Sequence, residues 1–223
     1  MCVYTFIENH DWNGKTVIPF ITHEGSGMGG TDRKVLELRN NKKGINNMKT
    51  VKLSNGVEMP QIGYGVYQVD PAECERCVSD ALKVGYRMID TAQAYHNEEG
   101  VGAAIAKSGI PREELFIVTK VWISNYGYEK AKASIDESLR KLGTDYIDLM
   151  LLHQPFCDRY GAYRALEEAY KAGKLRAIGV SNFYPDHLID LANNVEIPPM
   201  VNQVETHVYR AQNEAFNVEV GGF

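Results

Sequence analysis

The chain has 223 residues, of which 44% are hydrophobic and 24% are charged, the ordinary composition of a soluble globular protein. The formal net charge of -5 provides no basic field for a nucleic acid or an anionic membrane surface. No apolar run approaches the roughly 20 residues needed to span a bilayer. The N-terminus lacks the basic region and the small-residue cleavage site of a secretion signal, so we predict a cytoplasmic protein.

The first part of the chain contains a glycine pattern that invites a nucleotide-binding interpretation. Residues 16–22 are typical of a strand, and residues 25–30 then satisfy the G-x-G-x-x-G pattern of dinucleotide-binding proteins. A Rossmann unit also needs a helix that opens within the glycines and a second strand that ends in an acidic residue about 20 residues on. The chain instead enters a polar linker at residues 39–47, so we interpret the glycines as a loop and not as a dinucleotide site.

The sequence of residues 12–23, with Gly25, Ser26 and Gly27 after it, resembles the C-terminal half of flavodoxin-like proteins. The resemblance covers one strand and one loop within residues 5–38. Flavodoxins hold the FMN phosphate on an N-terminal loop rich in Thr and Gly, and nothing before residue 5 supplies such a loop. We therefore predict a flavodoxin-like fragment at residues 1–38 without an FMN site. A flavodoxin-type electron carrier remains an alternative function.

From Met48 onward the pattern becomes regular. Residues 51–59 alternate around Asn55-Gly56, the strongest short signal for a β-hairpin. Apolar strands and helices then alternate, and strands of this kind, each followed by a helix, pair in parallel with both faces covered. Such an order gives either a doubly wound sheet or a (β/α)8 barrel. The predicted strands are 62–68, 87–90, 115–120, 146–153, 177–181 and 201–205, and the predicted helices are 71–84, 97–107, 128–142, 162–172 and 185–193.

Two of the four cysteines, Cys74 and Cys77, have the C-x-x-C spacing of a redox pair or of half a zinc site. No second Cys or His pair follows at ligand spacing, and the segment is predicted to be helical. We therefore interpret both cysteines as packing and surface residues, and we expect no metal site.

Polar residues stand at the ends of the predicted strands. Each of them has a plain alternative explanation, such as a solvated strand end, a loop start before Pro155 or a helix cap. All of them nevertheless stand at the same end of their strands, which favours the barrel. In a barrel, the C-terminal ends of the strands converge on one mouth, where active sites form. These residues are Asp90, Lys120, His153, Ser181 with Asn182, and Gln203.

The segment from Gly85 to Glu99 holds a buried carboxylate at a strand end, Asp90, and a phenol five residues later, Tyr95. This arrangement indicates proton transfer, and the alternative is an Asp that caps a turn beside a Tyr that packs. We expect Asn97 to cap the following helix, with Glu98 and Glu99 in its first turn.

Five segments of the chain together resemble the aldo-keto reductase family. The match is nearly residue for residue at 85–98 and continues at 119–122, 151–155, 178–183 and 202–207. The sequence is most similar to bacterial members that reduce small dicarbonyls and keto sugars, such as diketogluconate reductases. The resemblance implies a (β/α)8 TIM-type barrel that binds NADPH without a Rossmann fingerprint. It also implies the reduction of aldehydes or ketones to alcohols by direct hydride transfer.

The resemblance also implies a role for each residue at the mouth. Tyr95 would be the general acid, and Lys120, paired with Asp90, would lower the pKa of its phenol. His153 would orient the carbonyl and stabilise charge on its oxygen. Ser181, Asn182 and Gln203 would bind the nicotinamide carboxamide, and Trp122, with His153, would line the substrate pocket.

The resemblance stops before the barrel is complete. We count six of the eight strands, and residues 216–223 resemble no part of the family. The expected domains are a flavodoxin-like fragment (1–38), a linker (39–47), a C-terminally truncated reductase (48–215) and an unrelated tail (216–223). The missing part would hold the Tyr that stacks on the nicotinamide and the basic loop that binds the 2′-phosphate. Open strand edges near Ile62 and Gln203 would favour self-association. An inactive fragment, or a barrel that a partner completes, is therefore the alternative to an active reductase.

Overall fold

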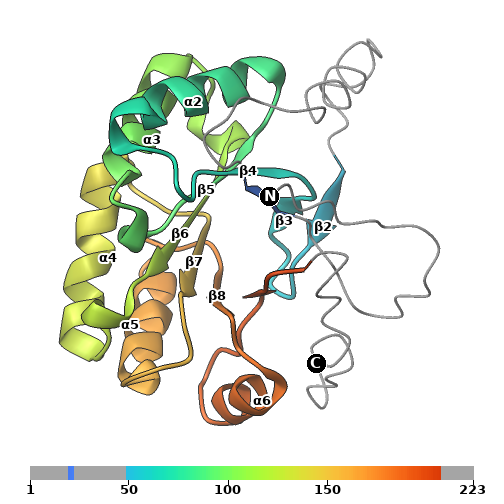
Figure 1. Cartoon of the computed structure of the whole chain (residues 1–223). Coiled ribbons are helices and arrows are strands. Elements are labelled where there is room, and N and C mark those ends of the chain that lie inside the picture. The colour runs from blue at the N-terminus through green and yellow to red at the C-terminus, as the bar shows by residue number, and fades with distance from the viewer. Residues whose placement is uncertain (1–19, 23–48, 207–223) are drawn as a thin grey trace.

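The computed structural model describes residues 20–22 and 49–206 (Figure 1). Within that part, the strands are β1 (Phe20–Thr22), β2 (Thr50–Lys52), β3 (Glu58–Pro60), β4 (Gly63–Gly65), β5 (Met88–Asp90), β6 (Phe116–Val121), β7 (Leu149–Leu152), β8 (Ile178–Ser181) and β9 (Asn202–Gln203). The helices are α2 (Pro71–Val84), α3 (Glu98–Ser108), α4 (Tyr128–Leu142), α5 (Arg159–Lys171) and α6 (Pro185–Asn193). Three short 3-10 turns are η1 (Gln93–Tyr95), η2 (Arg112–Glu114) and η3 (Ile123–Asn125).

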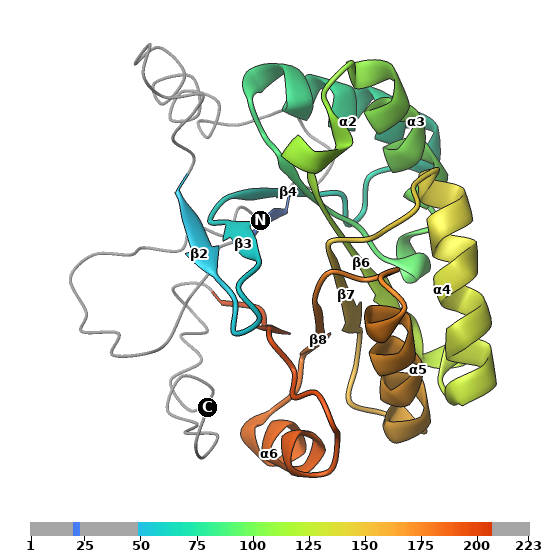
Figure 2. The same cartoon turned by 180° about the vertical axis from the view of Figure 1, so that it is seen from behind.

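The order of the strands decides between the two predicted architectures. Strands β4 to β9 pair in parallel in the same order as they occur in the chain, without the reversal that a doubly wound sheet requires. Helices α2 to α5 stand side by side along the outer face of this curled sheet (Figures 1 and 2). The fold is therefore six strands of a (β/α)8 barrel, as the sequence predicted.

The first strand of the sheet comes from the N-terminal segment. Strand β1 pairs in parallel with β4, with Phe20 opposite Gly63 and Thr22 opposite Gly65. The prediction of an open edge near Ile62 is therefore wrong, because β1 satisfies the backbone groups of β4 on that side. The remainder of the predicted segment 1–38, including its glycine loop, lies outside the described residues, as do the whole linker (39–47) and the whole tail (216–223).

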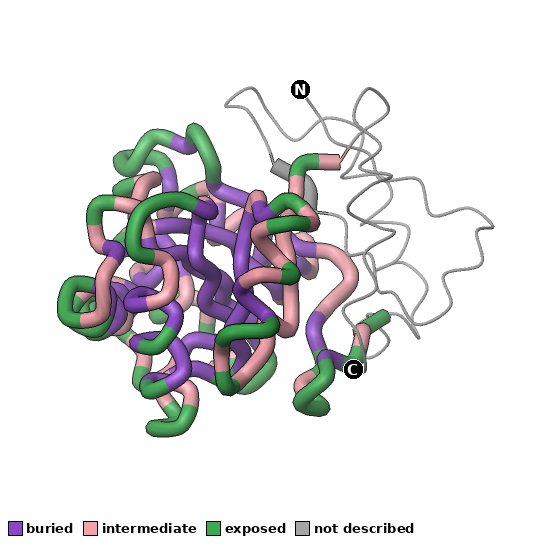
Figure 3. Tube along the Cα trace, turned by 90° about the horizontal axis from the view of Figure 1, so that it is seen from below, coloured by how far each residue is buried: buried purple, intermediate pink, exposed green. Residues whose placement is uncertain are grey.

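Alternation along the strands produces two separate cores. Outward residues such as Ile89, Ile117 and Met150 pack against the helices, whereas inward residues such as Met88 and Val118 fill the inside of the sheet. The hairpin β2–β3 covers the inner core with Leu53 and Met59. Figure 3 shows the buried stretches of the chain in the interior and the exposed segments around them.

Local chemistry explains why the helix bounds were predictable. Helix α2 begins at Pro71, Asp70 accepts a hydrogen bond of 2.8 Å from the backbone N–H of Ala72, and Gly85 ends the helix with φ of 114°. Helices α4 and α6 also have their predicted bounds. Helix α5 begins three residues before its predicted start, because the Asp158 side chain accepts from the N–H of Gly161 and caps it there.

The strand predicted at 146–153 is shorter in the structure, and Asp148 is the reason. Its buried carboxylate accepts a hydrogen bond of 2.9 Å from the backbone N–H of Ile117 and pairs with Arg112 and Arg176 at 2.7 and 2.6 Å. The side chain thus takes a position that a ladder hydrogen bond would occupy. Regular pairing begins only at Leu149.

Helices α3 and α4 touch at Gly102, and we expect Gly102→Ala to destabilise the fold. A Cβ at this position would lie 2.7 Å from the carbonyl oxygens of Lys141 and Leu142, which are backbone atoms and cannot rotate away. The overpacking cost of about 1–3 kcal/mol should exceed the roughly 1 kcal/mol that alanine gains in a helix. Urea denaturation measures the difference, with the exposed Ala106→Gly as a control for helix propensity alone. An increase in stability for Gly102→Ala would contradict this contact.

No helix within residues 20–22 and 49–206 has the length and apolarity needed to cross a membrane. The same described residues contain no group of three or more Cys, His, Asp and Glu side chains that could hold a metal ion.

Candidate active site

The inward face of the sheet carries a change from apolar to polar side chains along each strand. Asp90 stands two residues after Met88, Lys120 two after Val118, and Ser181 two after Gly179, so each shares the inward face at the C-terminal strand end. His153 follows β7 in the same way. The structure thus brings the predicted residues of four strands to one mouth.

A buried ion pair lies at the centre of this mouth. The Lys120 ammonium lies 2.7 Å from Asp90 Oδ1 and donates a further hydrogen bond of 3.0 Å to the carbonyl of Thr91. The other Asp90 oxygen, Oδ2, accepts from Gln203 Nε2 at 3.1 Å. Both charges are therefore paired, as burial requires.

Tyr95 extends from the turn η1 and lies next to Lys120 and His153. The Lys120 ammonium is 5.2 Å from the centre of the Tyr95 ring, and the His153 ring centre is 5.6 Å away in an edge-on arrangement. Burial first, and then the negative charge of Asp90, raises the pKa of the Tyr95 phenol above its ordinary value. The prediction of a lowered pKa for Tyr95 is therefore wrong for this structure, because burial and the Asp90 charge outweigh any effect of the Lys120 ammonium, which pairs with Asp90 and Thr91.

His153 lies between two aromatic rings and is nearly buried. Its ring centre is 5.0 Å from that of Trp122, and its Nδ1 atom is buried without a hydrogen-bond partner among the described residues. Burial, and then the Lys120 charge, lowers the pKa of His153 to about 3. The imidazole is therefore neutral near pH 7 and can donate one N–H to a bound oxygen.

The lowered pKa of His153 predicts a pH dependence of stability. Between pH 6.5 and about 3, the unfolded chain binds a proton at this residue and the folded chain does not, so the free energy of unfolding falls as the pH falls. At pH 5 the loss from this group should be about 2 kcal/mol. Urea denaturation between pH 7 and pH 4.5 should give a shallower decline for His153→Gln than for the unaltered chain. Parallel curves would contradict the prediction.

The three residues predicted to bind the nicotinamide lie together across β8 and β9. The Ser181 hydroxyl donates to the carbonyl of Gln203 at 2.9 Å, and Asn182 Nδ2 donates to the carbonyl of His153 at 3.0 Å. Within the described residues, the side-chain carbonyls of Asn182 and Gln203 accept no hydrogen bond from the protein. These two acceptors fit the amide N–H groups of a carboxamide.

The structure adds residues that the sequence analysis did not assign to the site. Tyr67, 49% exposed, places its ring 5.1 Å from that of Tyr95. Asn97 is the N-cap residue of α3, as predicted, but its side chain makes no capping hydrogen bond: it donates to the carbonyls of Val66 and Val69 and accepts from the Thr91 hydroxyl. Glu98 and Glu99 do stand in the first turn of α3. The sequence predicts a strand at 62–68 that includes Tyr67. Because β4 ends at Gly65, Tyr67 instead lies on the loop after the strand, and the sequence pattern did not indicate this early end.

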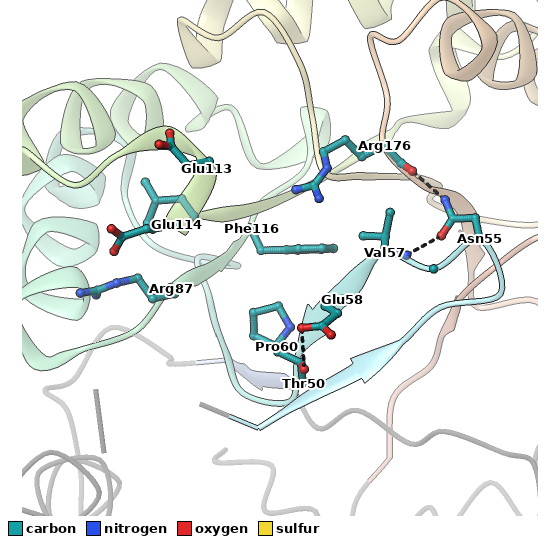
Figure 4. A pocket seen from close by; sticks show the side chains of 12 residues that line it. Thr50, Asn55, Val57, Glu58, Pro60, Arg87, Glu113, Glu114, Phe116 and Arg176 are labelled. Carbon is teal, nitrogen blue, oxygen red and sulfur yellow. Dashed lines mark hydrogen bonds between the residues drawn. The ribbon is translucent and has the colours of Figure 1, made fainter. Parts of the chain in front are cut away.

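A pocket of about 830 Å³ opens at the opposite end of the sheet (Figure 4). Arg87 precedes β5 and Arg176 precedes β8, so this pocket faces the N-terminal ends of the strands. It contains none of the predicted site residues. Its lining is Thr50, Asn55, Gly56, Val57, Glu58, Pro60, Arg87, Glu113, Glu114, Leu115, Phe116 and Arg176.

Comparison with known proteins agrees with this geometry. A family model described as "Aldo/keto reductase family" matches residues 52–219, about three quarters of the chain. This chain belongs to the aldo-keto reductase family. Glyoxal reductase from Bacillus subtilis is 54% identical to it over 167 residues, which are 74% of this chain and 60% of the relative.

Two solved structures have the same fold over most of this chain. A protein provisionally assigned as a 2,5-diketo-D-gluconic acid reductase B is 45% identical, with a TM-score of 0.73 over 78% of this chain and 62% of its own. The Bombyx mori aldo-keto reductase, solved in complex with NADP, is 34% identical, with a TM-score of 0.69 over 72% of this chain and 59% of its own.

The chain spans about 60% of the length of the curated relatives it matches. A second family model, described as "Flavodoxin", matches residues 1–62. This match includes the segment 5–38 in which the sequence analysis found a flavodoxin resemblance. Of residues 1–62, the structure describes only 20–22 and 49–62.

Proposed function

We propose that this aldo-keto reductase reduces the aldehyde or ketone group of small dicarbonyl compounds to an alcohol, with NADPH as cofactor and Tyr95 as proton donor. The observation that carries the proposal is the convergence of Tyr95, neutral His153 and the Lys120–Asp90 pair at one end of the strands. The name of the glyoxal reductase relative supports a small dicarbonyl as substrate, and a keto sugar is the alternative of the same class. A cytoplasmic location stays a prediction from the sequence.

The side chains divide the chemistry at the carbonyl oxygen. Neutral His153 donates a hydrogen bond that orients the carbonyl and stabilises negative charge on its oxygen. The raised pKa of Tyr95 keeps its phenol protonated, so a proton is present to neutralise that oxygen as the alcohol forms. Asp90 holds the Lys120 ammonium beside the Tyr95 ring, and this positive charge partly offsets the negative charge that remains on the phenolate after Tyr95 gives up its proton. When bound, NADPH supplies the hydride.

Binding and orientation come from the edges of the mouth. Ser181, Asn182 and Gln203 would hold the nicotinamide carboxamide. The side-chain carbonyls of Asn182 and Gln203 would accept from its amide N–H groups, and the Ser181 hydroxyl lies beside them, bonded to the Gln203 backbone. Trp122 would line the substrate pocket together with His153, since the two rings are in contact. We also propose the domain division 1–38, 39–47, 48–215 and 216–223. The family matches, at 1–62 and 52–219, support a flavodoxin-like part followed by a reductase part.

The test is NADPH consumption by the purified chain with methylglyoxal or glyoxal. We expect substrate-dependent loss of NADPH absorbance that the Tyr95→Phe variant, purified identically, does not show. The variant controls for reductases carried over from the host. A sample that melts cooperatively and binds NADPH but consumes none would overturn the proposal and favour the alternative of an inactive fragment or a barrel completed by a partner.

The flavodoxin match favours a second candidate, an electron carrier that binds flavin through its N-terminal segment. Visible flavin absorbance in the purified protein would support this candidate. Its absence after incubation with FMN and removal of free flavin would dismiss it.

A further inference from the structure

Gln93 is the residue that connects the parts of the candidate site. It begins the turn η1, two residues before Tyr95, and its half-buried side chain makes four hydrogen bonds. Its Nε2 donates to the Ser134 carbonyl at 3.2 Å and to the Ser138 hydroxyl at 3.1 Å. Its Oε1 accepts from the backbone N–H of Trp122 at 3.0 Å and from Asn125 Nδ2 at 2.9 Å.

These four contacts fix the orientation of the amide. A glutamine side chain has two N–H donors and one carbonyl oxygen with two lone pairs, and all four are used here. A peptide carbonyl can only accept and a peptide N–H can only donate, so Ser134 and Trp122 settle which end of the amide is which. The side chain can therefore neither flip nor turn to water without breaking hydrogen bonds.

The partners belong to separate elements. Ser134 and Ser138 lie on helix α4, whereas Trp122 and Asn125 lie on the loop that follows β6. Gln93 thus joins the turn that carries Tyr95 to the loop that carries Trp122, and anchors both to a helix. His153 stands between these two rings, 5.6 Å from Tyr95 and 5.0 Å from Trp122.

We infer that Gln93 is a positioning residue that sets the distance between the proton donor Tyr95 and the substrate-pocket residue Trp122. Gln93 does not touch the reacting atoms. Its effect passes through the backbone N–H of Trp122 on one side and through the short turn to Tyr95 on the other. The inference rests on the proposed function for its catalytic consequence, but its structural part can be measured without turnover.

The first measurement is hydrogen exchange at the backbone amide of Trp122 in Gln93→Met, which keeps the length of the side chain and removes all four hydrogen bonds. We expect exchange at this amide to be faster by about fivefold to tenfold, the effect of losing one hydrogen bond. Gln61→Met, the same chemical change beside the hairpin, is the matched control and should leave the Trp122 amide unaltered. Unchanged exchange in Gln93→Met would overturn the inference whether or not the protein turns over.

The second measurement uses Gln93→Glu as a conservative replacement. A protonated carboxylic acid presents one donor and one acceptor in nearly the same shape as the amide, whereas the carboxylate presents acceptors only. Ionisation removes the donor to the Ser134 carbonyl and places a carboxylate oxygen against that carbonyl oxygen, so the side chain should turn away from α4. Trp122 exchange, relative to the unaltered chain, should therefore be close to normal at low pH and rise as the new carboxyl ionises. If Gln93 contributed only packing, Trp122 exchange in Gln93→Glu would not depend on the ionisation of the new carboxyl. Exchange that does not change with pH, relative to the unaltered chain, would therefore count against the inference.

Kinetics supply the functional readout where the chain is active. Misplacing Trp122 should lower kcat/KM for the dicarbonyl by about tenfold in Gln93→Met and leave the affinity for NADPH unaltered, because Ser181, Asn182 and Gln203 are not touched. Faster Trp122 exchange with an unchanged kcat/KM would overturn the positioning role. An inactive unaltered chain would refute the proposed function alone, and the exchange experiments would still decide the inference.

Discussion

Replacing Lys120 by methionine is expected to lower the free energy of unfolding by about 3–5 kcal/mol, because the change leaves the Asp90 carboxylate buried without its counter-charge. The Lys120 and Asp90 side chains are 1% and 6% exposed, so water cannot replace the lost ammonium. Gln203 would remain as a partner of Asp90, at 3.1 Å, but as a neutral donor. Urea denaturation at pH 7 measures the loss, and the same variant should show no NADPH-dependent turnover.

Two further variants separate burial from charge. Lys132→Met removes an ammonium from the surface pair with Glu168, whose side chains are 48% and 47% exposed, and should have a much smaller effect. Combining Lys120→Met with Asp90→Leu removes both buried charges and should restore most of the lost stability, without restoring activity. A Lys120→Met variant as stable as Lys132→Met would show that the Asp90–Lys120 pair is not held in a buried site.

Most of the barrel could be predicted from the sequence because the capping residues, the apolar pattern of the strands and the alternation of strands with helices all indicate the same fold. Pro71 with Asp70 and Gly85 marks both ends of α2, and the apolar strands could only be buried beneath helices. The mouth was predictable for a related reason. Asp90, Lys120 and Ser181 each follow an inward core residue by two positions, so a parallel register brings them together without any further information.

Long-range contacts of single side chains could not be predicted in the same way. Asp148 delays the start of regular pairing in β7 through partners that lie about 30 residues away in either direction along the chain. Gln93 likewise reaches residues on η3 and α4. The pKa of Tyr95 depends on how deeply the fold buries the phenol, and burial, followed by the charge of Asp90, raises this pKa where a lowered one was expected. The pairing of β1 with β4 joins two segments with different family resemblances, and no local pattern in either one indicates it.

Removal of one oxygen atom in Tyr95→Phe should abolish most turnover and leave the fold intact. A general acid contributes about 10²–10⁴-fold to the rate, so we expect kcat to fall by that factor. The Tyr95 hydroxyl makes no hydrogen bond among the described residues, and its ring contacts with Tyr67 and His153 survive in phenylalanine. The free energy of unfolding should therefore change by less than about 0.5 kcal/mol, unlike that of Lys120→Met.

The comparison that makes this result decisive is Tyr170→Phe, which removes the same atom near the end of α5, close to Asn55 and far from the mouth. That variant should keep its turnover, and NADPH affinity should be the same in both variants and in the unaltered chain. Equal turnover in Tyr95→Phe and Tyr170→Phe would mean that the proton comes from elsewhere, and neutral His153 would then be the nearest candidate. A loss confined to Tyr95→Phe, in a protein of unchanged stability, assigns the proton to the phenol, because no other property of the site has been altered.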